Sequence, residues 1–243
     1  MNPADDTGNE ILEVISNAGK FNEWMYKTIT PFLHGNILEI GSGIGNISQF
    51  FLADKKIITL SDTDGYYLQT LRQKFSGFSN LKEVLEINLE HPQFESIYHP
   101  LKEQYDSIFL LNVLEHIRND SLAIENCKHL LKQGGTLLLL CPAYSFLYSA
   151  LDKELGHHRR YTISKLNSLL KNHDLIIKKK FYFNAIGVIA WYYGKLMKLK
   201  TIPSSDMGLY NKLVPVAKFI DKITFRKKGL SAIIIAEKKE RNI

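Results

Sequence analysis

Cysteine is scarce in this sequence, which has two among 243 residues, and no apolar run reaches the roughly 18 residues that crossing a bilayer requires. Cys127 and Cys141 stand in apolar or helical surroundings without metal-like spacing. We therefore expect two buried free thiols rather than a disulfide or zinc framework. No basic segment followed by an apolar one opens the chain, so we expect no signal peptide and a cytoplasmic protein.

Metal-binding and nucleic-acid-binding patterns are also missing. His157 and His158 are adjacent, but no H-x-x-x-H pair with a nearby carboxylate occurs, so no metal site is predicted. The chain shows no added nucleic-acid-binding module, and we expect no nucleic-acid partner. Hydrophobic residues make up 45% of the chain, which is ordinary for a globular protein.

Charge is distributed unevenly along the chain. Residues 151–243 carry 20 lysines and arginines against 7 acidic residues, a net +13, whereas residues 1–150 carry 11 against 18, a net −7. The basic part suits an anionic partner such as a membrane surface, a phosphorylated substrate or nucleic acid. A solvated lysine-rich surface explains the same charge, and both interpretations stay open.

The segment from Asn36 to Phe51 has the pattern of a strand, a glycine-rich turn and a helix. Residues 37–40 form a short apolar strand, and Gly41, Gly43 and Gly45 follow at once. Glycines there let a ligand lie against the backbone, and the helix start offers unpaired N–H groups. This is the front end of a nucleotide-binding βαβ unit.

The glycine spacing distinguishes two kinds of ligand. A dinucleotide fingerprint, G-x-G-x-x-G, has its third glycine where Asn46 stands. Glu39, just before the turn, suits a cationic ligand and would repel a pyrophosphate. The stretch resembles motif I, E-x-G-x-G-x-G, of class I S-adenosylmethionine (SAM)-dependent methyltransferases. An NAD(P)-dependent oxidoreductase is the alternative for this segment.

Two further segments of the sequence resemble motifs of the same family. Residues 112–117 (NVLEHI) resemble the V-L-E-H-[IV] motif that follows strand 4 in methyltransferases of the ubiquinone-biosynthesis O-methyltransferase type. Residues 131–142 resemble the family's L-K-x-G-G, apolar strand and proline. After the strand 37–40, we expect strands at residues 56–60, 81–87, 105–111, 136–141, 175–183 and 229–237. The resemblance implies a doubly wound α/β fold with a mostly parallel, seven-stranded sheet and an antiparallel last strand.

The resemblance also implies a cofactor site. An acidic residue after the second strand is placed to hold a ribose diol, and Asp62 is our choice, with Asp64 as an alternative that can instead cap a helix. Asn88 is expected near the adenine, and Glu39 on the ammonium side of SAM. The predicted cofactor-binding residues are Glu39, Gly41, Ser42, Gly43, Gly45, Asp62, Thr63, Asn88, Leu89, Asn112 and Val113.

The acceptor side is expected after strands 4 and 5. His116, His157 and His158 are the candidate general bases, although His116 could instead orient the following helix. Arginines supply forked donors for carboxylate or phosphate. They could instead pair with Asp152 and Glu154. The predicted acceptor-binding residues are Tyr144, Arg159, Arg160 and Tyr161.

We expect one domain over residues 1–243. Residues 1–34 form a helical cap that either covers the cofactor cleft or serves packing. Residues 35–183 and 229–239 form the core, and residues 184–228 form a helical insertion. This insertion is expected to be a lid or acceptor wall, with peripheral membrane contact through residues 185–228, or else an extra packing layer.

The predicted reaction is SN2 methyl transfer from SAM to an oxygen of a small-molecule, glycan or lipid-linked acceptor. Positioning of the reactants would supply much of the rate. The alternative of another class is a catalytically silent methyltransferase-like module that docks on a membrane or protein. The sequence leaves the oligomeric state open.

Overall fold

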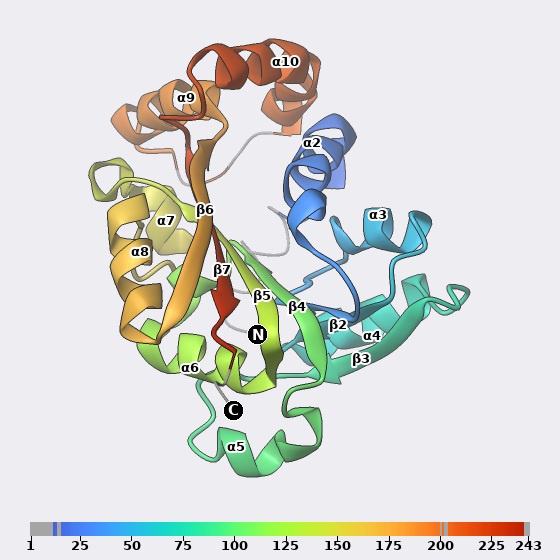
Figure 1. The fold of residues 1–243 in the computed structure, drawn as a ribbon. Coiled ribbons are helices and arrows are strands. Elements are labelled where there is room, and N and C mark those ends of the chain that lie inside the picture. Colours follow the sequence, from blue (N-terminus) through green and yellow to red (C-terminus); the bar gives the residue numbers. More distant parts are fainter. Residues whose placement is uncertain (1–11, 14–15, 200, 202–203, 241–243) are drawn as a thin grey trace.

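A seven-stranded sheet organises the protein (Figure 1). The computed structural model describes residues 12–13, 16–199, 201 and 204–240. The strand order is β3-β2-β1-β4-β5-β7-β6. The strands are β1 Ile37–Ile40, β2 Ile58–Asp62, β3 Leu81–Glu86, β4 Tyr105–Leu111, β5 Leu131–Pro142, β6 Leu175–Phe183 and β7 Ser231–Lys238.

Helices alternate with the first strands and cluster toward the end of the chain. The α-helices are α2 Gly19–Ile29, α3 Ser48–Ala53, α4 Gly65–Lys74, α5 Phe94–Ile97, α6 Asp120–Leu130, α7 Ala150–Glu154, α8 Ile163–Asn172, α9 Ala185–Leu196 and α10 Ser204–Ile223. Among the described residues, the four short 3₁₀ helices are η1 Thr30–Phe32, η2 His99–Leu101, η3 Leu114–His116 and η4 Ser145–Leu147. Within the described part of the chain, none of these helices is long and apolar enough to cross a membrane.

The strand directions confirm the predicted fold class. Strands β1 to β5 pair in parallel, whereas β7 pairs antiparallel with both β5 and β6. β1, β4 and β6 have the predicted bounds, because each is a clear apolar or β-branched run. The two helices predicted between the last strands are α9 and α10.

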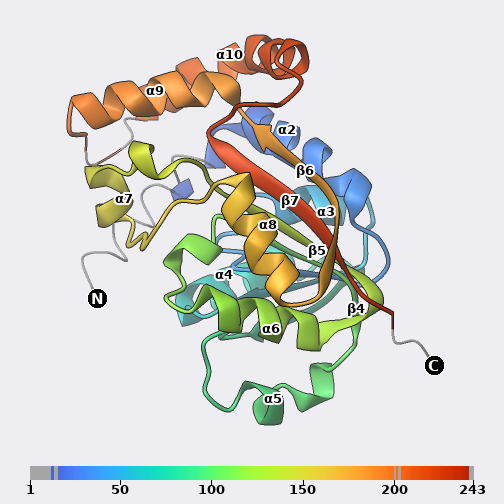
Figure 2. The same ribbon diagram turned by 60° about the vertical axis from the view of Figure 1, so that its left-hand side comes forward.

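Two apolar cores cover the two faces of the sheet (Figure 2). α6 and α8 pack on one face through side chains such as Ile124 and Leu166. α2 and α3 pack on the other through Trp24 and Phe51, and α10 packs against α2 beyond the end of the sheet, with Val214 in the same cluster. Cys127 and Cys141 are free and buried, as predicted.

The structure corrects one local prediction. β5 begins at Leu131 rather than at residue 136, because α6 ends at Leu130 with an extended Leu131 as its cap, and Gly134 and Gly135 lie within the strand. Gly134 has φ +71°, so it bends the start of the strand rather than capping a helix. The connection between β3 and β4 contains α5 and η2.

The sheet order places a topological switch point beside β1. The chain leaves β1 toward β2 on one side and returns to β4 on the other. Ligands of open α/β sheets bind in the crevice beyond the carboxyl ends of strands at such a point. The residues that follow β1, β2, β4 and β5 are therefore the ones to compare with the predicted site.

Candidate active site

The loop between β1 and α3 holds its three glycines in the left-handed region, with φ of +71° at Gly41, +52° at Gly43 and +78° at Gly45. A Cβ at Gly41 would lie 2.4 Å from Val113, and a Cβ at Gly45 would lie 2.4 Å from the Phe75 ring. These two positions therefore need glycine for the packing of the protein itself, in addition to the backbone conformation.

Gly43 differs from its two neighbours. A Cβ there would meet only Leu12, at 3.1 Å, from the N-terminal segment. The Asn46 side chain donates a hydrogen bond of 3.0 Å to the Leu12 carbonyl. Leu12 therefore lies against the open side of the glycine loop, while α2 packs in the core.

Asp62, at the end of β2, supports the glycine loop. Its Oδ2 accepts a 2.9 Å hydrogen bond from the Gly43 N–H, and its Oδ1 accepts bonds from the N–H groups of Thr63 and Asp64 at 2.8 and 3.1 Å. Burial raises the pKa of Asp62, although these bonds oppose the rise. A carboxylate offers about four acceptor positions, so one remains for a ligand hydroxyl. Asp64 caps α4 by accepting from the Tyr66 N–H, as its alternative role predicted.

Glu39 is buried in β1 beneath the loop. Its Oε2 accepts a 2.5 Å hydrogen bond from the Ser48 hydroxyl at the start of α3. Burial raises the pKa of Glu39 to about 8, although hydrogen bonds from Ser48 and Ser42 oppose the rise. The carboxyl thus fastens α3 and the loop to the strand.

Asn88 and Leu89 follow β3 and have different environments. Asn88 is exposed, and its side-chain oxygen accepts from the Glu90 N–H at 2.9 Å. Leu89 is buried in the core, where its carbonyl accepts from the Asn126 side chain at 2.8 Å. Asn88 therefore offers a free amide nitrogen near this edge of the sheet, whereas Leu89 offers backbone.

The turn after β4 connects the glycine loop with the histidines. Asn112 has φ +54°, an uncommon conformation that asparagine tolerates, and its N–H donates to the Leu140 carbonyl at 2.8 Å. Val113 is the side chain that packs against Gly41. Its carbonyl accepts a 3.0 Å hydrogen bond from the His116 N–H. One turn thus contacts the glycine loop through Val113 and leads directly to His116.

Two of the three predicted catalytic histidines lie side by side, with their rings edge to face. The ring centroids of His116 and His157 lie 4.7 Å apart with an interplanar angle of 86°. Partial enclosure, together with the neighbouring His157 and His158, holds the pKa of His116 below its ordinary value. His158 is exposed, and its N–H donates to the Glu115 carbonyl at 2.8 Å. His116 is thus a neutral imidazole near neutral pH with an exposed edge.

Asp152 of α7 organises the other side of this cluster. Its Oδ1 lies 2.8 Å from both His157 Nδ1 and Arg160 Nε. Its Oδ2 accepts from the Ser149 N–H and hydroxyl, which closes a capping box at the start of α7. Burial alone would raise the pKa of Asp152, but the hydrogen bond from His157 and the charge of Arg160 lower it.

The predicted acceptor-binding residues have separate environments. Arg160 is 1% exposed, and its guanidinium carbon lies 4.4 Å from the Trp191 ring centroid. Tyr161 is also buried, and its hydroxyl donates to Asp120 at 2.9 Å. Arg159 is partly exposed and pairs with the same carboxylate at 3.0 Å.

Tyr144 is held in a strained conformation. Its φ is +62°, and its N–H donates to the Tyr161 carbonyl at 2.8 Å. Its ring stacks between Phe146 and Tyr182, with centroids 5.4 and 5.1 Å away. Tyr144 and Arg159 thus retain exposed surface for a ligand, whereas Arg160 and Tyr161 hold the loop from inside the protein.

Two residues were missed as site residues by sequence reasoning. Glu115 is fully buried beside His116, and burial raises its pKa to about 8. Asp152 was considered only as a partner of an arginine, yet it also orients His157. The V-L-E-H motif contained the signal for Glu115, because an acidic residue between Leu114 and the motif histidine must lie close to that imidazole.

The geometry fits SAM at the switch point. At Gly43 only the Leu12 side chain lies against the loop, and Asp62 retains an acceptor position beside it. Residues 38–137 match the model of a methyltransferase domain family. This match favours SAM over the dinucleotide of the alternative interpretation.

The curated relatives are much longer proteins, and this chain matches a small part of each. Over 156 residues, the chain is 28% identical to the probable polyketide synthase 42 of Dictyostelium discoideum, which corresponds to 56% of this chain and 6% of that protein. Over 192 residues, it is 25% identical to the hybrid PKS-NRPS synthetase gkaA of Penicillium citrinum, or 73% of this chain and 5% of that protein. The chain thus spans about one twentieth of the length of these relatives.

Solved structures share the fold. A SAM-dependent methyltransferase from Archaeoglobus fulgidus has a TM-score of 0.58 at 16% identity, covering 89% of this chain and 94% of the other. Phosphoethanolamine N-methyltransferase 2 from Haemonchus contortus, in complex with SAM, has a TM-score of 0.60 at 14% identity, covering 90% and 52%. Residues 38–137 thus match a methyltransferase domain family, and the strand order is that of the class I, SAM-dependent methyltransferase fold.

Proposed function

We propose that this chain transfers the methyl group of SAM to an oxygen nucleophile of a small-molecule, glycan or lipid-linked acceptor. The observation that carries the proposal is the turn after β4. Val113 packs against Gly41 of the cofactor loop, and its carbonyl accepts from the N–H of His116. A ligand on the glycine loop therefore has a basic imidazole close by, at the carboxyl edge of the sheet.

On the cofactor side, each proposed contact uses a group that the fold presents. The glycine loop with Ser42 receives the amino-acid part of SAM, and the buried Glu39 carboxyl supports its ammonium side through the loop. Asp62 and Thr63 receive the ribose, and Asn88 with the Leu89 backbone receives the adenine. The turn of Asn112 and Val113 lies beside the methionine chain.

On the acceptor side, the residues position a hydroxyl and accept its proton. SAM, when bound, supplies a methyl group on a positively charged sulfur. Holding the reacting atoms in line is worth effective concentrations on the order of 10⁵–10⁸ M. The neutral ring of His116 accepts the hydroxyl proton, with His157 and His158 as its neighbours. Tyr144 and Arg159 present an aromatic face and a cation to the rest of the acceptor.

An isotope experiment tests this proposal. Purified protein is incubated with methyl-labelled SAM and separate panels of phenols, sugars and lipid-linked glycans, and the labelled atom is assigned by NMR. We expect label on oxygen, and a loss of at least tenfold in kcat for His116→Gln with little change in the affinity for SAM. Label found on nitrogen or carbon would refute the oxygen assignment. An unchanged rate in the variant would remove His116 as the base.

The polyketide synthase relatives suggest a competing acceptor class. Their names place methyltransferase-like sequence within enzymes that build carbon chains, and one solved neighbour is the CMeT domain of the citrinin polyketide synthase. A carrier-bound β-ketoacyl thioester therefore belongs in the same panel. Its labelling in preference to the hydroxyl acceptors would replace the oxygen assignment by carbon.

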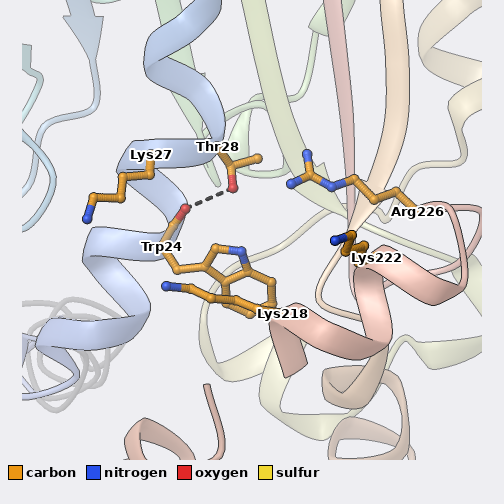
Figure 3. A pocket seen from close by; sticks show the side chains of 6 residues that line it. All are labelled: Trp24, Lys27, Thr28, Lys218, Lys222 and Arg226. Carbon is orange, nitrogen blue, oxygen red and sulfur yellow. Dashed lines mark hydrogen bonds between the residues drawn. The ribbon is translucent and has the colours of Figure 1, made fainter. Parts of the chain in front are cut away.

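We further infer that α9 and α10 rest on an anionic membrane surface. Trp24, Lys218, Lys222 and Arg226 line a pocket where α2 meets the end of α10 (Figure 3). Large apolar side chains are exposed on the same two helices and just after them: Ile189, Tyr192, Tyr193, Leu196, Met197, Val216, Phe219, Ile223 and Phe225. Aromatic and apolar groups interleaved with cations are typical of helices that lie in a membrane interface.

Vesicle sedimentation tests this membrane contact. The protein should sediment with phosphatidylglycerol vesicles and stay in the supernatant with phosphatidylcholine alone. Phe219→Ser should weaken binding several-fold, whereas the control Ile57→Ser, exposed on a different part of the molecule, should not. Equal sedimentation with both lipids, or equal loss in both variants, would contradict the inference.

A further inference from the structure

Burial of the Glu115 carboxyl is energetically unfavourable. Its side chain is fully buried, and neither carboxyl oxygen has a hydrogen-bond partner within the part of the chain that the structure describes. Leaving a buried polar group unpaired costs about 1–3 kcal/mol, and more when the group is charged. The other buried carboxyls of the crevice, Glu39 and Asp152, are hydrogen-bonded. The Glu115 carboxyl therefore needs a hydrogen-bond or metal partner that the described residues do not supply.

The free carboxyl faces two imidazoles. A carboxyl oxygen of Glu115 and one ring nitrogen each of His116 and His157 all lie within 4.8 Å of one another. The three residues come from η3 and from the loop after α7. Two imidazoles and one carboxylate are a ligand set of divalent transition metals, and this set leaves coordination positions open.

The surroundings of His157 orient it for this role. Its Nδ1 lies 2.8 Å from Asp152 Oδ1, which also accepts from Arg160 Nε. With Nδ1 in contact with this carboxylate, Nε2 is the ring nitrogen left for another ligand. Carboxylates that hold metal-binding histidines by the opposite ring nitrogen are a general feature of metal sites.

We propose that Glu115, His116 and His157 bind one divalent transition-metal ion of the Zn²⁺ class. Ligand atoms of one tetrahedral Zn²⁺ lie about 3.4 Å apart, as follows from bond lengths of about 2.1 Å. The ligand atoms must therefore approach one another by up to about 1.4 Å, and the exposed His116 ring is the one with room to rotate. Mg²⁺ and Ca²⁺ prefer oxygen ligands and fit this set poorly.

The open positions of the ion face the acceptor side of the crevice. An acceptor oxygen bound there would be held beside the turn that reaches the cofactor loop. His116 would then be a ligand instead of the base. This role in acceptor binding rests on the proposed function, whereas binding of the ion does not.

Metal titration of tag-free, chelator-treated protein tests the site. Zn²⁺ is added in a calorimeter, and Co²⁺ is added in a spectrophotometer, where d–d absorption reports imidazole and carboxylate ligation. We expect one equivalent of each ion per chain. His116→Ala should weaken binding at least 100-fold, and Asp152→Asn should weaken it about 10- to 100-fold by releasing His157.

His173→Ala is the matched control. His173 also lies 2.8 Å from a carboxylate, that of Glu125, but its other ring nitrogen contacts Ser121, so removing it should leave the metal affinity unchanged. Every variant is checked by circular dichroism and by SAM calorimetry, so loss of metal binding is distinguished from loss of the fold or of the cofactor site. If Asp152→Asn does not fold, metal titration of His116→Ala, at an exposed residue, provides the test. Absence of a tight equivalent in the native protein, or equal binding by His116→Ala, would overturn the proposal.

Discussion

Buried carboxyl groups differ in their hydrogen-bond partners between the proposed cofactor side and the proposed acceptor side of the crevice. On the cofactor side, Glu39 accepts from Ser48, and Asp62 accepts three backbone N–H groups. On the acceptor side, Glu115 is at least as buried, and neither of its oxygens has a partner among the described residues. The glycine loop thus has its shape set by the protein alone, whereas the Glu115 cluster is incomplete without a further group.

Because of this difference, substitutions of the two kinds of side chain should affect different properties of the protein. Side chains that complete a network contribute to the free energy of unfolding, and their loss leaves partners unpaired. Side chains without partners should instead affect ligand binding.

The largest effect is expected for Arg160→Ala. The guanidinium pairs with Asp152 where both side chains are almost fully buried, so its removal leaves an uncompensated charge. Such losses cost about 3–5 kcal/mol of unfolding free energy, measured by urea denaturation. The control is Arg159→Ala, whose partly exposed pair with Asp120 should contribute less than about 1 kcal/mol. Equal effects of the two substitutions would contradict the described network.

Glu39 should make stability depend on pH. Its folded pKa of about 8 lies above its ordinary 4.5, so the folded state binds more protons between these values. Stability is therefore full below about pH 4.5 for this group and is lost as pH rises toward 8. Between pH 5.5 and 8 the loss is about 3 kcal/mol, and Glu39→Gln should remove that part of the native pH dependence. The exposed Glu83→Gln is the control, and an unchanged slope for Glu39→Gln would refute the assignment.

Gly45→Ala should lower stability by about 2 kcal/mol. The new Cβ would lie 2.4 Å from Phe75 in a backbone with φ +78°, so both contact and conformation are unfavourable. Gly77, whose added Cβ meets nothing within 4 Å, provides the control Gly77→Ala. Thermal denaturation of both variants measures the difference, and a smaller loss at residue 45 than at residue 77 would be the contrary result.

Glu115→Met and Glu39→Met compare the two carboxyls most closely. In metal-free protein, replacing the unpartnered Glu115 by an apolar side chain should stabilise the fold by about 1–2 kcal/mol. The same change at Glu39 leaves the Ser48 hydroxyl unpaired and should destabilise by a similar amount. Urea denaturation at pH 6 measures both, and the same sign for both variants would break the comparison.

Local sequence patterns were sufficient for most of the fold. The runs at residues 37–40 and 105–111 are short, apolar and followed by polar turns, and the structure has strands with those bounds. β5 begins five residues earlier than predicted, because Gly134 can serve either a helix end or a bent strand. The choice is made by pairing with β4, which is a tertiary effect that local propensity does not contain.

The spatial arrangement of the candidate site could be predicted less completely from the sequence. The V-L-E-H and H-H-R-R-Y segments lie about 40 residues apart, and the sequence marked both as candidates without showing that His116 meets His157. The inward direction of Arg160 depends on Asp152 and Trp191, which come from α7 and α9. Long-range contacts of this kind decide whether an arginine faces a ligand or the protein interior.

Calorimetric titration of SAM tests the central claim most directly, with native protein, Gly43→Val, Asp62→Ala and the control Gly77→Val. A methyltransferase cofactor site at the glycine loop predicts micromolar binding by the native protein and by Gly77→Val, with binding abolished in the other two variants. Absence of binding by folded native protein would contradict the account and favour a docking module. Binding that persists in Gly43→Val and Asp62→Ala would place the cofactor elsewhere.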